Sequence, residues 1–158
     1  MPVGELEPLL GTNHFRVLIG RREIGFSEVR GLTSTTEVGD AVARPTHRFE
    51  MVVLRRALTG SKELFDWRCR FAAGYDDRRT VTIQQLDGPS GRVVNAWQLQ
   101  RAWPRRWSGP TFNAMGNDVA MEELELGYDG LIWLVAPPSN PPRPPTARRR
   151  RRTTGKGA

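Results

Sequence analysis

The alternation of apolar and polar residues along the chain predicts β-strands as its main element. In "HFRVLIG", apolar positions 15, 17 and 19 fall on one face, as expected of a half-buried strand. Alternating or β-branched segments follow in "IGFSEV", "LTSTTEV", "HRFEMVVLRR", "RTVTIQQLD", "RVVNAWQLQRAW" and "NDVAMEELELGYDGL". Seven or eight strands and a "GPSG" hairpin turn indicate a mainly-β domain, a β-barrel or a two-sheet β-sandwich.

The same alternation predicts which side chains face the core. The expected sets are Phe15, Val17 and Ile19; Phe49, Met51 and Val53; Val81 and Ile83; Val93, Trp97 and Leu99; and Leu124, Leu126 and Tyr128.

One segment changes period and predicts a single short helix. "SKELFDWRCRFAAG" places Leu64, Trp67 and Phe71 at helical spacing, which indicates an amphipathic helix over 62–73. Ser61 is the expected N-cap and Gly74 the C-terminal stop.

The charge of the chain divides it into a neutral body and a basic tail. The formal net charge is +7, which at first suggests a nucleic-acid binder. Residues 137–158 contain seven cations and no acid, so the body retains 17 of the 24 Lys and Arg against all 17 Asp and Glu. The seven are Arg143, Arg148, Arg149, Arg150, Arg151, Arg152 and Lys156.

The tail also has its own composition. It holds six of the twelve prolines and no aromatic residue, which predicts a disordered or polyproline II segment. We therefore expect an N-terminal arm over 1–12, a folded domain over 13–136 and a Pro/Arg-rich tail over 137–158.

No pattern in the sequence indicates a reaction centre. His14 and His47 stand in no metal-binding frame, and no phosphate-binding or nucleophile motif is present. Cys69 is the only cysteine and is expected to be a buried or semi-buried inert thiol, so no intramolecular disulfide can form. We expect no catalysis, no cofactor and no metal.

The stretch "NAWQLQRAWPRRWSGPTFNA" carries three of the five tryptophans. Trp97 lies on an expected core face, whereas Trp103 and Trp107 flank "PRR". They could stack bases, pack an internal corner or form a subunit interface. A neutral body disfavours base stacking and leaves the other two open.

This stretch and its continuation resemble a known family. "AWPRRWSGPTFNAMGNDVAMEELELGYDGL" is similar to the C-terminal half of the tail tube proteins of contractile-tailed bacteriophages, and of inner tube proteins of phage-like contractile injection systems. "FRVLIGRREIGFSEVRGLTSTTEV" and "LRRALTGSKELFDW" resemble earlier parts of the pattern, so the resemblance covers about residues 13–134. Asp118 stands where the family usually has Glu, and the basic tail has no counterpart.

The resemblance implies a structural protein and not an enzyme. Such subunits form hexameric rings that stack into a tube around a channel for DNA or protein cargo, with a sheath protein outside and a baseplate at one end. It implies assembly in the bacterial cytoplasm as a component of a phage tail or injection particle. Gln84, Gln98 and Glu123 would suit a water-lined wall. The expected assembly corner is Trp103, Pro104, Arg106, Trp107, Gly109, Pro110 and Asn113.

Two other classes remain open from the residues alone. One is a nucleic-acid-binding β-barrel module with a basic tail, and the other is an enzyme that uses Cys69 or a histidine. For the tube subunit, we expect the clustered cations of the tail to contact a polyanion, and the alternative is a tail that only keeps the protein in solution.

Overall fold

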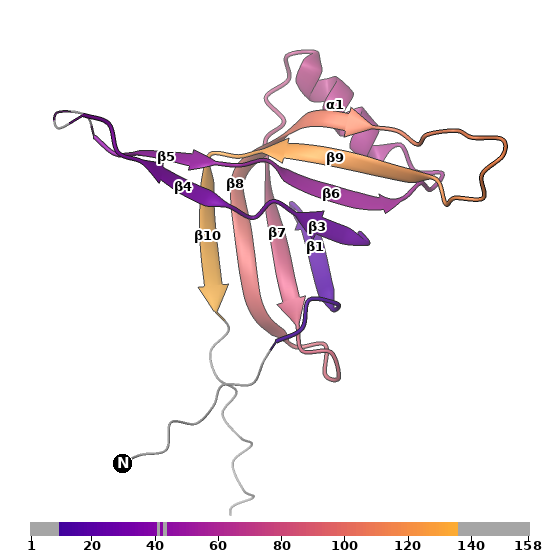
Figure 1. Ribbon diagram of the computed structural model, residues 1–158, viewed down its shortest axis with the longest axis horizontal. Coiled ribbons are helices and arrows are strands. Elements are labelled where there is room, and N and C mark those ends of the chain that lie inside the picture. The colour runs from indigo at the N-terminus through magenta and orange to yellow at the C-terminus, as the bar shows by residue number, and fades with distance from the viewer. Residues whose placement is uncertain (1–9, 41, 43, 136–158) are drawn as a thin grey trace, which may run out of the picture.

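The computed structural model describes residues 10–40, 42 and 44–135 and is built mainly from strands (Figure 1). A single helix, α1 (Glu63–Ala72), lies between β6 and β7 among these residues. The strands are β1 (Phe15–Ile19), β2 (Arg22–Ile24), β3 (Glu28–Arg30), β4 (Ser34–Glu37), β5 (Thr46–Phe49), β6 (Val52–Ala57), β7 (Arg79–Leu86), β8 (Val93–Ser108), β9 (Met121–Gly127) and β10 (Gly130–Val135).

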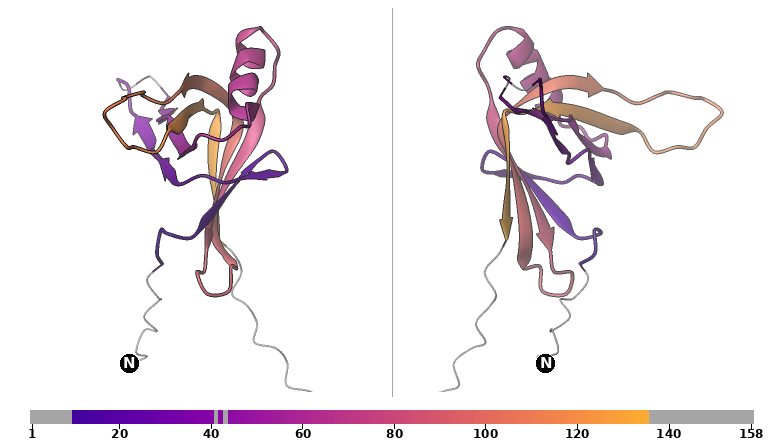
Figure 2. Two further views of the ribbon diagram at one scale, coloured as in Figure 1. Left: turned by 90° about the vertical axis from the view of Figure 1, so that its right-hand side faces the viewer. Right: turned by 60° about the vertical axis from the view of Figure 1, so that its left-hand side comes forward.

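Two antiparallel sheets share the long strand β8. Its N-terminal half pairs with β7 on one side and β10 on the other, and β1 and β2 follow β7 to complete the first sheet. Its C-terminal half pairs with β9, followed by β6 and β3, to form the second sheet. The two sheets cross at a steep angle, as the views show (Figures 1 and 2). The expectation of a two-sheet sandwich is therefore confirmed, and the described strands do not close into a barrel.

The chain bends between the sheets at Arg101. This residue has a φ of 50°, and the β7–β8 register shifts beside it, between Arg79 and Val81. A bulge with a residue in the left-handed region turns a strand sharply. The Trp-Pro-Arg-Arg-Trp stretch that follows stays within β8 and contains a second register shift, between Pro104 and Arg106.

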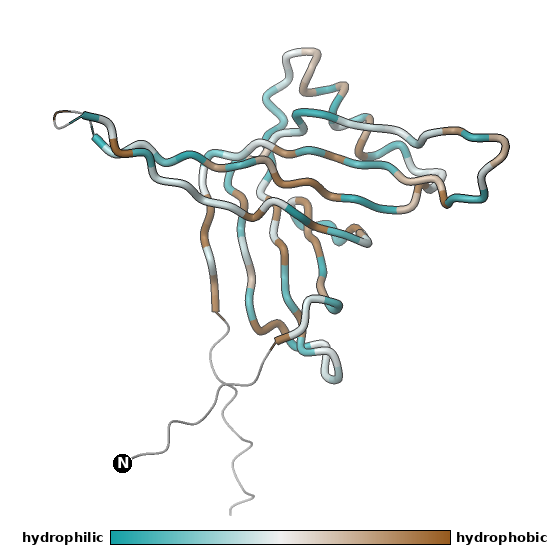
Figure 3. Tube along the Cα trace, in the orientation of Figure 1, coloured by the Kyte–Doolittle hydropathy of each residue, from teal (hydrophilic) through white to brown (hydrophobic). Residues whose placement is uncertain are grey.

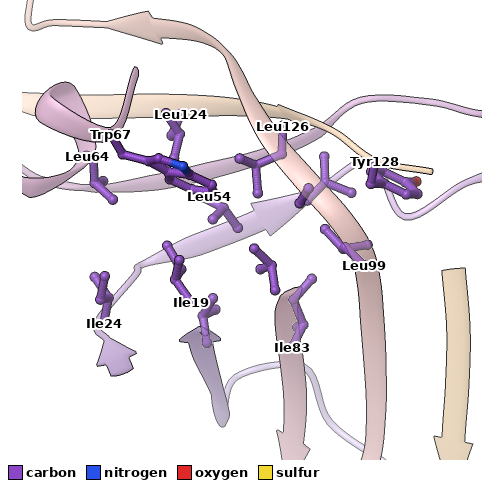
Figure 4. Packing of buried hydrophobic residues seen from close by; sticks show 14 residues of the cluster. Ile19, Ile24, Leu54, Leu64, Trp67, Ile83, Leu99, Leu124, Leu126 and Tyr128 are labelled. Carbon is purple, nitrogen blue, oxygen red and sulfur yellow. The ribbon is translucent and has the colours of Figure 1, made fainter. Parts of the chain in front are cut away.

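The apolar core lies where the two sheets cross, under α1 (Figure 4). Leu99 and Val81 face it from the first sheet, and Leu54, Leu124 and Leu126 from the second, all at 0 % exposure. The helix contributes Leu64 and Trp67, and the Trp67 Nε1–H donates to the Asp77 carbonyl oxygen at 2.7 Å. The indole is therefore buried with its polar atom satisfied.

Several sequence predictions about this core are confirmed. The helix, Val17 and Ile19 in β1, Val81 and Ile83 in β7, and Leu124, Leu126 and Tyr128 all lie as expected. Gly74 ends the helix with a φ of 93°, which favours glycine.

Other predictions about local structure are wrong. The segment 47–56 is two strands, β5 and β6, and Val52 and Leu54 face the core in place of Met51 and Val53. Four consecutive apolar residues, "MVVL", cannot fix the face by alternation. "IGFSEV" is likewise divided between β2 and β3.

Three side chains also lie differently from expectation. Trp97 is only half-buried, and it lies in the half of β8 that pairs with β7 and β10 and not with the second sheet. Cys69 is exposed, since it faces away from the buried Leu64 and Trp67 on α1. Ser61 is not the N-cap, which is Lys62.

Candidate assembly surface

The C-terminal half of β8 places Trp107 against the second sheet. Its neighbour in register is Leu124, and its Nε1–H donates to Glu122 Oε2 at 2.9 Å. The ring packs edge-on against Phe65 of α1, with 5.0 Å between centroids. A Cβ on Gly109 would lie 2.9 Å from the indole, so glycine permits this close approach. Trp107 therefore joins β8, β9 and α1.

Beneath Trp107 lies a buried network of charged side chains. Glu122 is 2 % exposed and accepts from Arg56 Nε at 2.6 Å, and Arg56 is 7 % exposed. Arg56 also donates to Glu63 of α1 at 3.1 Å, and Glu63 pairs with Arg22 at 2.9 Å. Removing one partner of such a buried pair strands the other charge in the interior. The network thus fixes α1 to β6, β9 and β2.

Trp103 lies at the other end of the same half-strand, beside the turn between β9 and β10. A Cβ on its register partner Gly127 would be 2.5 Å from the indole, so this pair requires a glycine. The Arg78 guanidinium lies over the ring at 4.7 Å, and Arg78 and Arg101 both donate to Asp129. Trp103 therefore packs an internal corner.

The remaining corner residues lead into a long loop. Pro104 is buried, Arg106 is exposed, and Gly109, Pro110 and Asn113 begin the segment 109–120, which we call the projecting loop. Asn113 accepts from the Met115 and Gly116 backbone amides at 3.0 and 3.1 Å, a local turn. Of the expected set, the structure buries Pro104 and packs Trp107 against the core. It places Trp103 against Gly127 and Arg78, and Asn113 in the loop. All seven predicted tail cations lie outside the described residues.

Three surfaces of the described chain expose apolar side chains. The projecting loop presents Phe112, Met115 and Val119, at 71–95 % exposure. The β10 edge, Gly130–Val135, presents Ile132, Trp133, Leu134 and Val135, at 37–68 %. The β4–β5 arm, Ser34–Phe49 without the two undescribed positions, presents Val38 and Val42, at 78 % and 98 %.

Two of these surfaces are long extensions and the third is a strand edge. Figures 1 and 2 show the β4–β5 arm and the projecting loop leaving the body in different directions. Among the described strands, β10 pairs with β8 alone, so its other edge has no strand partner. Figure 3 shows the predominantly hydrophobic colour of β10. Sequence reasoning missed β10, although "LIWLV" is the longest strongly apolar run.

The outer faces of both sheets carry polar side chains, except where Ile132 and Leu134 of β10 lie on the outer face of the first sheet. Gln84 and Gln98, expected in a water-lined wall, lie half-buried on the face of the first sheet that turns away from the core. On the second sheet, Glu123 pairs with Arg55 at 3.5 Å and with Arg30 at 3.4 Å. These exposed pairs are worth little individually. They bring opposite charges together on the outer face of the second sheet.

Two titratable groups among the described residues have shifted pKa values, and neither belongs to a metal-binding cluster. No group of three or more His, Cys, Asp or Glu among them could hold a metal ion, and no described helix is long and apolar enough to cross a membrane. Hydrogen bonds from Arg79 lower the pKa of Asp77, and its contact with Arg70 adds to this shift. Burial raises the pKa of Tyr128, and Glu50 adds to the effect. Asp77 is held in ion pairs in the loop before β7, and Tyr128 packs against Phe49 after the end of β9.

Comparison with protein families assigns this architecture. Residues 11–132 match the T4-like virus tail tube protein gp19 family, which is more than half of the chain. The chain belongs to this family and is a tail tube structural subunit. No curated protein gave a match.

Solved structures show the same fold. The chain is similar to a chain from the sheath–tube complex of the extracellular contractile injection system PVC in its extended state, with 24 % identity, 83 % and 95 % of the two chains covered and a TM-score of 0.71. It is also similar to the tube-terminating cap of the anti-feeding prophage, at 17 % identity, 86 % and 100 % coverage and a TM-score of 0.72. Hcp1 from Flavobacterium johnsoniae follows at 14 % identity, 77 % and 95 % coverage and a TM-score of 0.56.

Proposed function

We propose that this subunit forms hexameric rings that stack into the inner tube of a contractile phage tail or injection system. The observation that carries the proposal is the β10 edge, an open strand with four exposed apolar side chains. An open apolar edge is a hazard for a monomer, and it becomes a joint when a neighbouring sheet pairs with it. The edge at β2 and β1 lies at the opposite end of the first sheet and is available for the other side of each ring contact.

The two extensions support contacts between rings. A contact that repeats head to tail needs two different surfaces on each subunit. The projecting loop and the β4–β5 arm are different surfaces, and both expose apolar residues far from the core. The corner of Trp103, Pro104 and Trp107 would hold the base of the loop rigid, and Arg106, Gly109, Pro110 and Asn113 would lie at or near the contact.

The partners of the tube follow from this assembly. A sheath would surround it, a baseplate would bind one end, and cargo, either protein or DNA, would occupy the channel. The subunit would be non-enzymatic, made in the bacterial cytoplasm and built into the particle. Residues 1–12 would form an arm and 13–136 the tube domain. The cations of residues 137–158 would contact a polyanion, with a steep dependence on salt.

The assembly is tested by charging the β10 edge. Leu134→Arg places a cation in the proposed joint, and we expect rings and tubes to be lost in negative-stain images and sedimentation. Tyr75→Arg is the matched control, because Tyr75 is 61 % exposed and lies outside the three surfaces. Tube formation by Leu134→Arg at wild-type yield would falsify the proposed joint. Loss of the fold in circular dichroism would instead require the milder Leu134→Ser.

A further inference from the structure

Trp133 is an exposed tryptophan in β10, near the end of the described chain, and its side chain is held by several contacts. Trp133 is 63 % exposed and stacks on Trp97 of β8, with 5.9 Å between ring centroids and an interplanar angle of 17°. Its Nε1–H donates to Asn95 Oδ1 at 3.0 Å, and Asn95 Nδ2 donates to Gln85 Oε1 at 2.9 Å. Gln85 in turn donates to the Gly11 carbonyl at 2.8 Å. This row of amides fixes the orientation of the indole while its face stays open.

An apolar pocket adjoins this tryptophan pair. Trp97 lines a pocket of about 390 Å³ together with Phe15, Val29, Leu32 and Ile83. The strand register places Trp133 opposite Trp97, and Trp97 opposite Ile83, so their side chains share one face of the first sheet. Trp133 and the pocket therefore lie next to each other on one face of the first sheet, joined by Trp97, and we call the two together the Trp133 groove.

The residues that follow β10 have the chemistry of a ligand for such a groove. The chain continues from Val135 as "APPSNPPRPP". Proline-rich segments favour polyproline II, and they bind grooves lined by aromatic rings because little conformational entropy is lost. Glu28 is the one charged residue among those that line the pocket, and it already pairs with Arg30 and Arg55 at 3.6 Å each, so apolar contacts carry the proposed binding.

We propose that residues 137–145 of this chain fold back and bind in the Trp133 groove of the same subunit. Ser139 and Asn140 are residue types that favour a turn, which would reverse the chain. The five residues 141–145 then span about 15 Å in polyproline II. The distance from Val135 back to Leu131 along β10 is about 13 Å at strand rise, so the segment is long enough. Covalent attachment gives it a high effective concentration at the groove.

This binding would give the two parts of the tail different roles. The prolines would cover the exposed tryptophan, and Arg148 to Arg152 would remain beyond the groove for other contacts. The occupant could instead be a second copy of the chain, and the experiment distinguishes the two.

Disulfide trapping tests the proposal in the full-length chain. In a Cys69→Ser background, Leu32→Cys at the groove is combined with Pro142→Cys in the segment, and mild oxidation follows. Formation of the bond requires the two Cα atoms to approach within about 7 Å. The control pair combines Pro142→Cys with Phe112→Cys in the projecting loop, which is outside the groove. Mass spectrometry of digests separates intrachain from interchain bonds, before and after assembly.

We expect an intrachain bond for the Leu32 pair at several times the yield of the Phe112 pair. Adding Trp133→Leu should lower that yield several-fold, and adding Val119→Ser, a change in another exposed apolar residue, should not. Equal yields for the two pairs, or no response to Trp133→Leu, would overturn the proposal. A bond found only between chains would assign the groove to a second copy and overturn it as well. Because the intrachain bond does not depend on tubes, the outcome is separate from that of the assembly test.

Discussion

The interior of this subunit and its three exposed apolar surfaces use apolar residues in opposite ways. In the interior, Leu54, Leu99 and Leu124 are fully buried, and the buried charges of Arg56 and Glu122 compensate each other. On the projecting loop, the β10 edge and the β4–β5 arm, apolar side chains face solvent in the single chain. The interior therefore determines whether the subunit folds, and the three exposed apolar surfaces are the ones that remain available for contacts with other subunits.

The largest expected effect is in the interior, at Trp67. This residue is 1 % exposed, so Trp67→Ala should lower the free energy of unfolding by roughly 3–5 kcal/mol. Urea denaturation monitored by circular dichroism measures the loss. Phe65→Ala on the exposed face of the same helix is the control and should cost clearly less. Equal losses would mean that α1 does not anchor the core through Trp67.

The buried charges should show a large loss that a second change repairs. Glu122→Leu leaves Arg56 in the interior with only Glu63, and we expect a loss of about 3 kcal/mol. Adding Arg56→Met removes the stranded charge, so the double variant should recover much of the stability. Denaturation of the wild type, of each single variant and of the double variant gives a double-mutant cycle, which measures the coupling energy between Arg56 and Glu122. If the losses in the two single variants simply add in the double variant, the two residues do not stabilise each other.

A smaller effect is expected where the interior strand bends. Arg101 has a φ of 50°, and its side chain pairs with Asp129 at 3.1 Å. Arg101→Ala removes the ion pair and keeps the strain, whereas Arg101→Gly removes both. The glycine variant should therefore be more stable than the alanine variant by about 1 kcal/mol. If Arg101→Ala is as stable as Arg101→Gly or more stable in denaturation, the left-handed conformation at residue 101 does not destabilise the protein.

The smallest effect on stability is expected on the projecting loop, together with a large effect on assembly. Phe112 is 86 % exposed, so Phe112→Ser should change the free energy of unfolding by less than about 0.5 kcal/mol. Tube yield by sedimentation should fall if the loop joins rings. Tyr75→Ser, also an exposed aromatic change, should leave both quantities unchanged. Unchanged tube yield for Phe112→Ser would remove the loop from the proposed contact.

The elements predicted from the sequence are those with one face in the core and the other toward solvent. β1, β7 and β9 alternate because one face is buried and the other is polar, and α1 is amphipathic for the same reason. β10 was missed because Ile132 and Leu134 on one face are as apolar as Trp133 and Val135 on the other. Such a strand has no alternation in the sequence, and its exposed residues on both faces fit an element that is covered on assembly.

The sequence identified several residues of the candidate site, but it did not predict how the fold arranges them. The tryptophan-rich stretch pointed to Trp103 and Trp107, which do pack a corner of the fold. The bend itself lies at Arg101, and no local pattern marks an arginine for the left-handed region. Likewise, the partnership of Trp107 with Glu122 and Arg56 depends on β6 and β9 pairing across more than sixty residues.

The sharing of β8 has a consequence for the folding pathway. Its sixteen residues complete both sheets, so neither sheet has its full set of neighbours until β8 is in place. The second sheet also requires β9 to pair with β6, which is distant in the sequence. Contacts of high sequence separation slow folding. We therefore expect both sheets to unfold in one cooperative transition, with matching hydrogen-exchange protection in β7 and β9. A newly made subunit would then present its open edges to neighbours only after both sheets have formed.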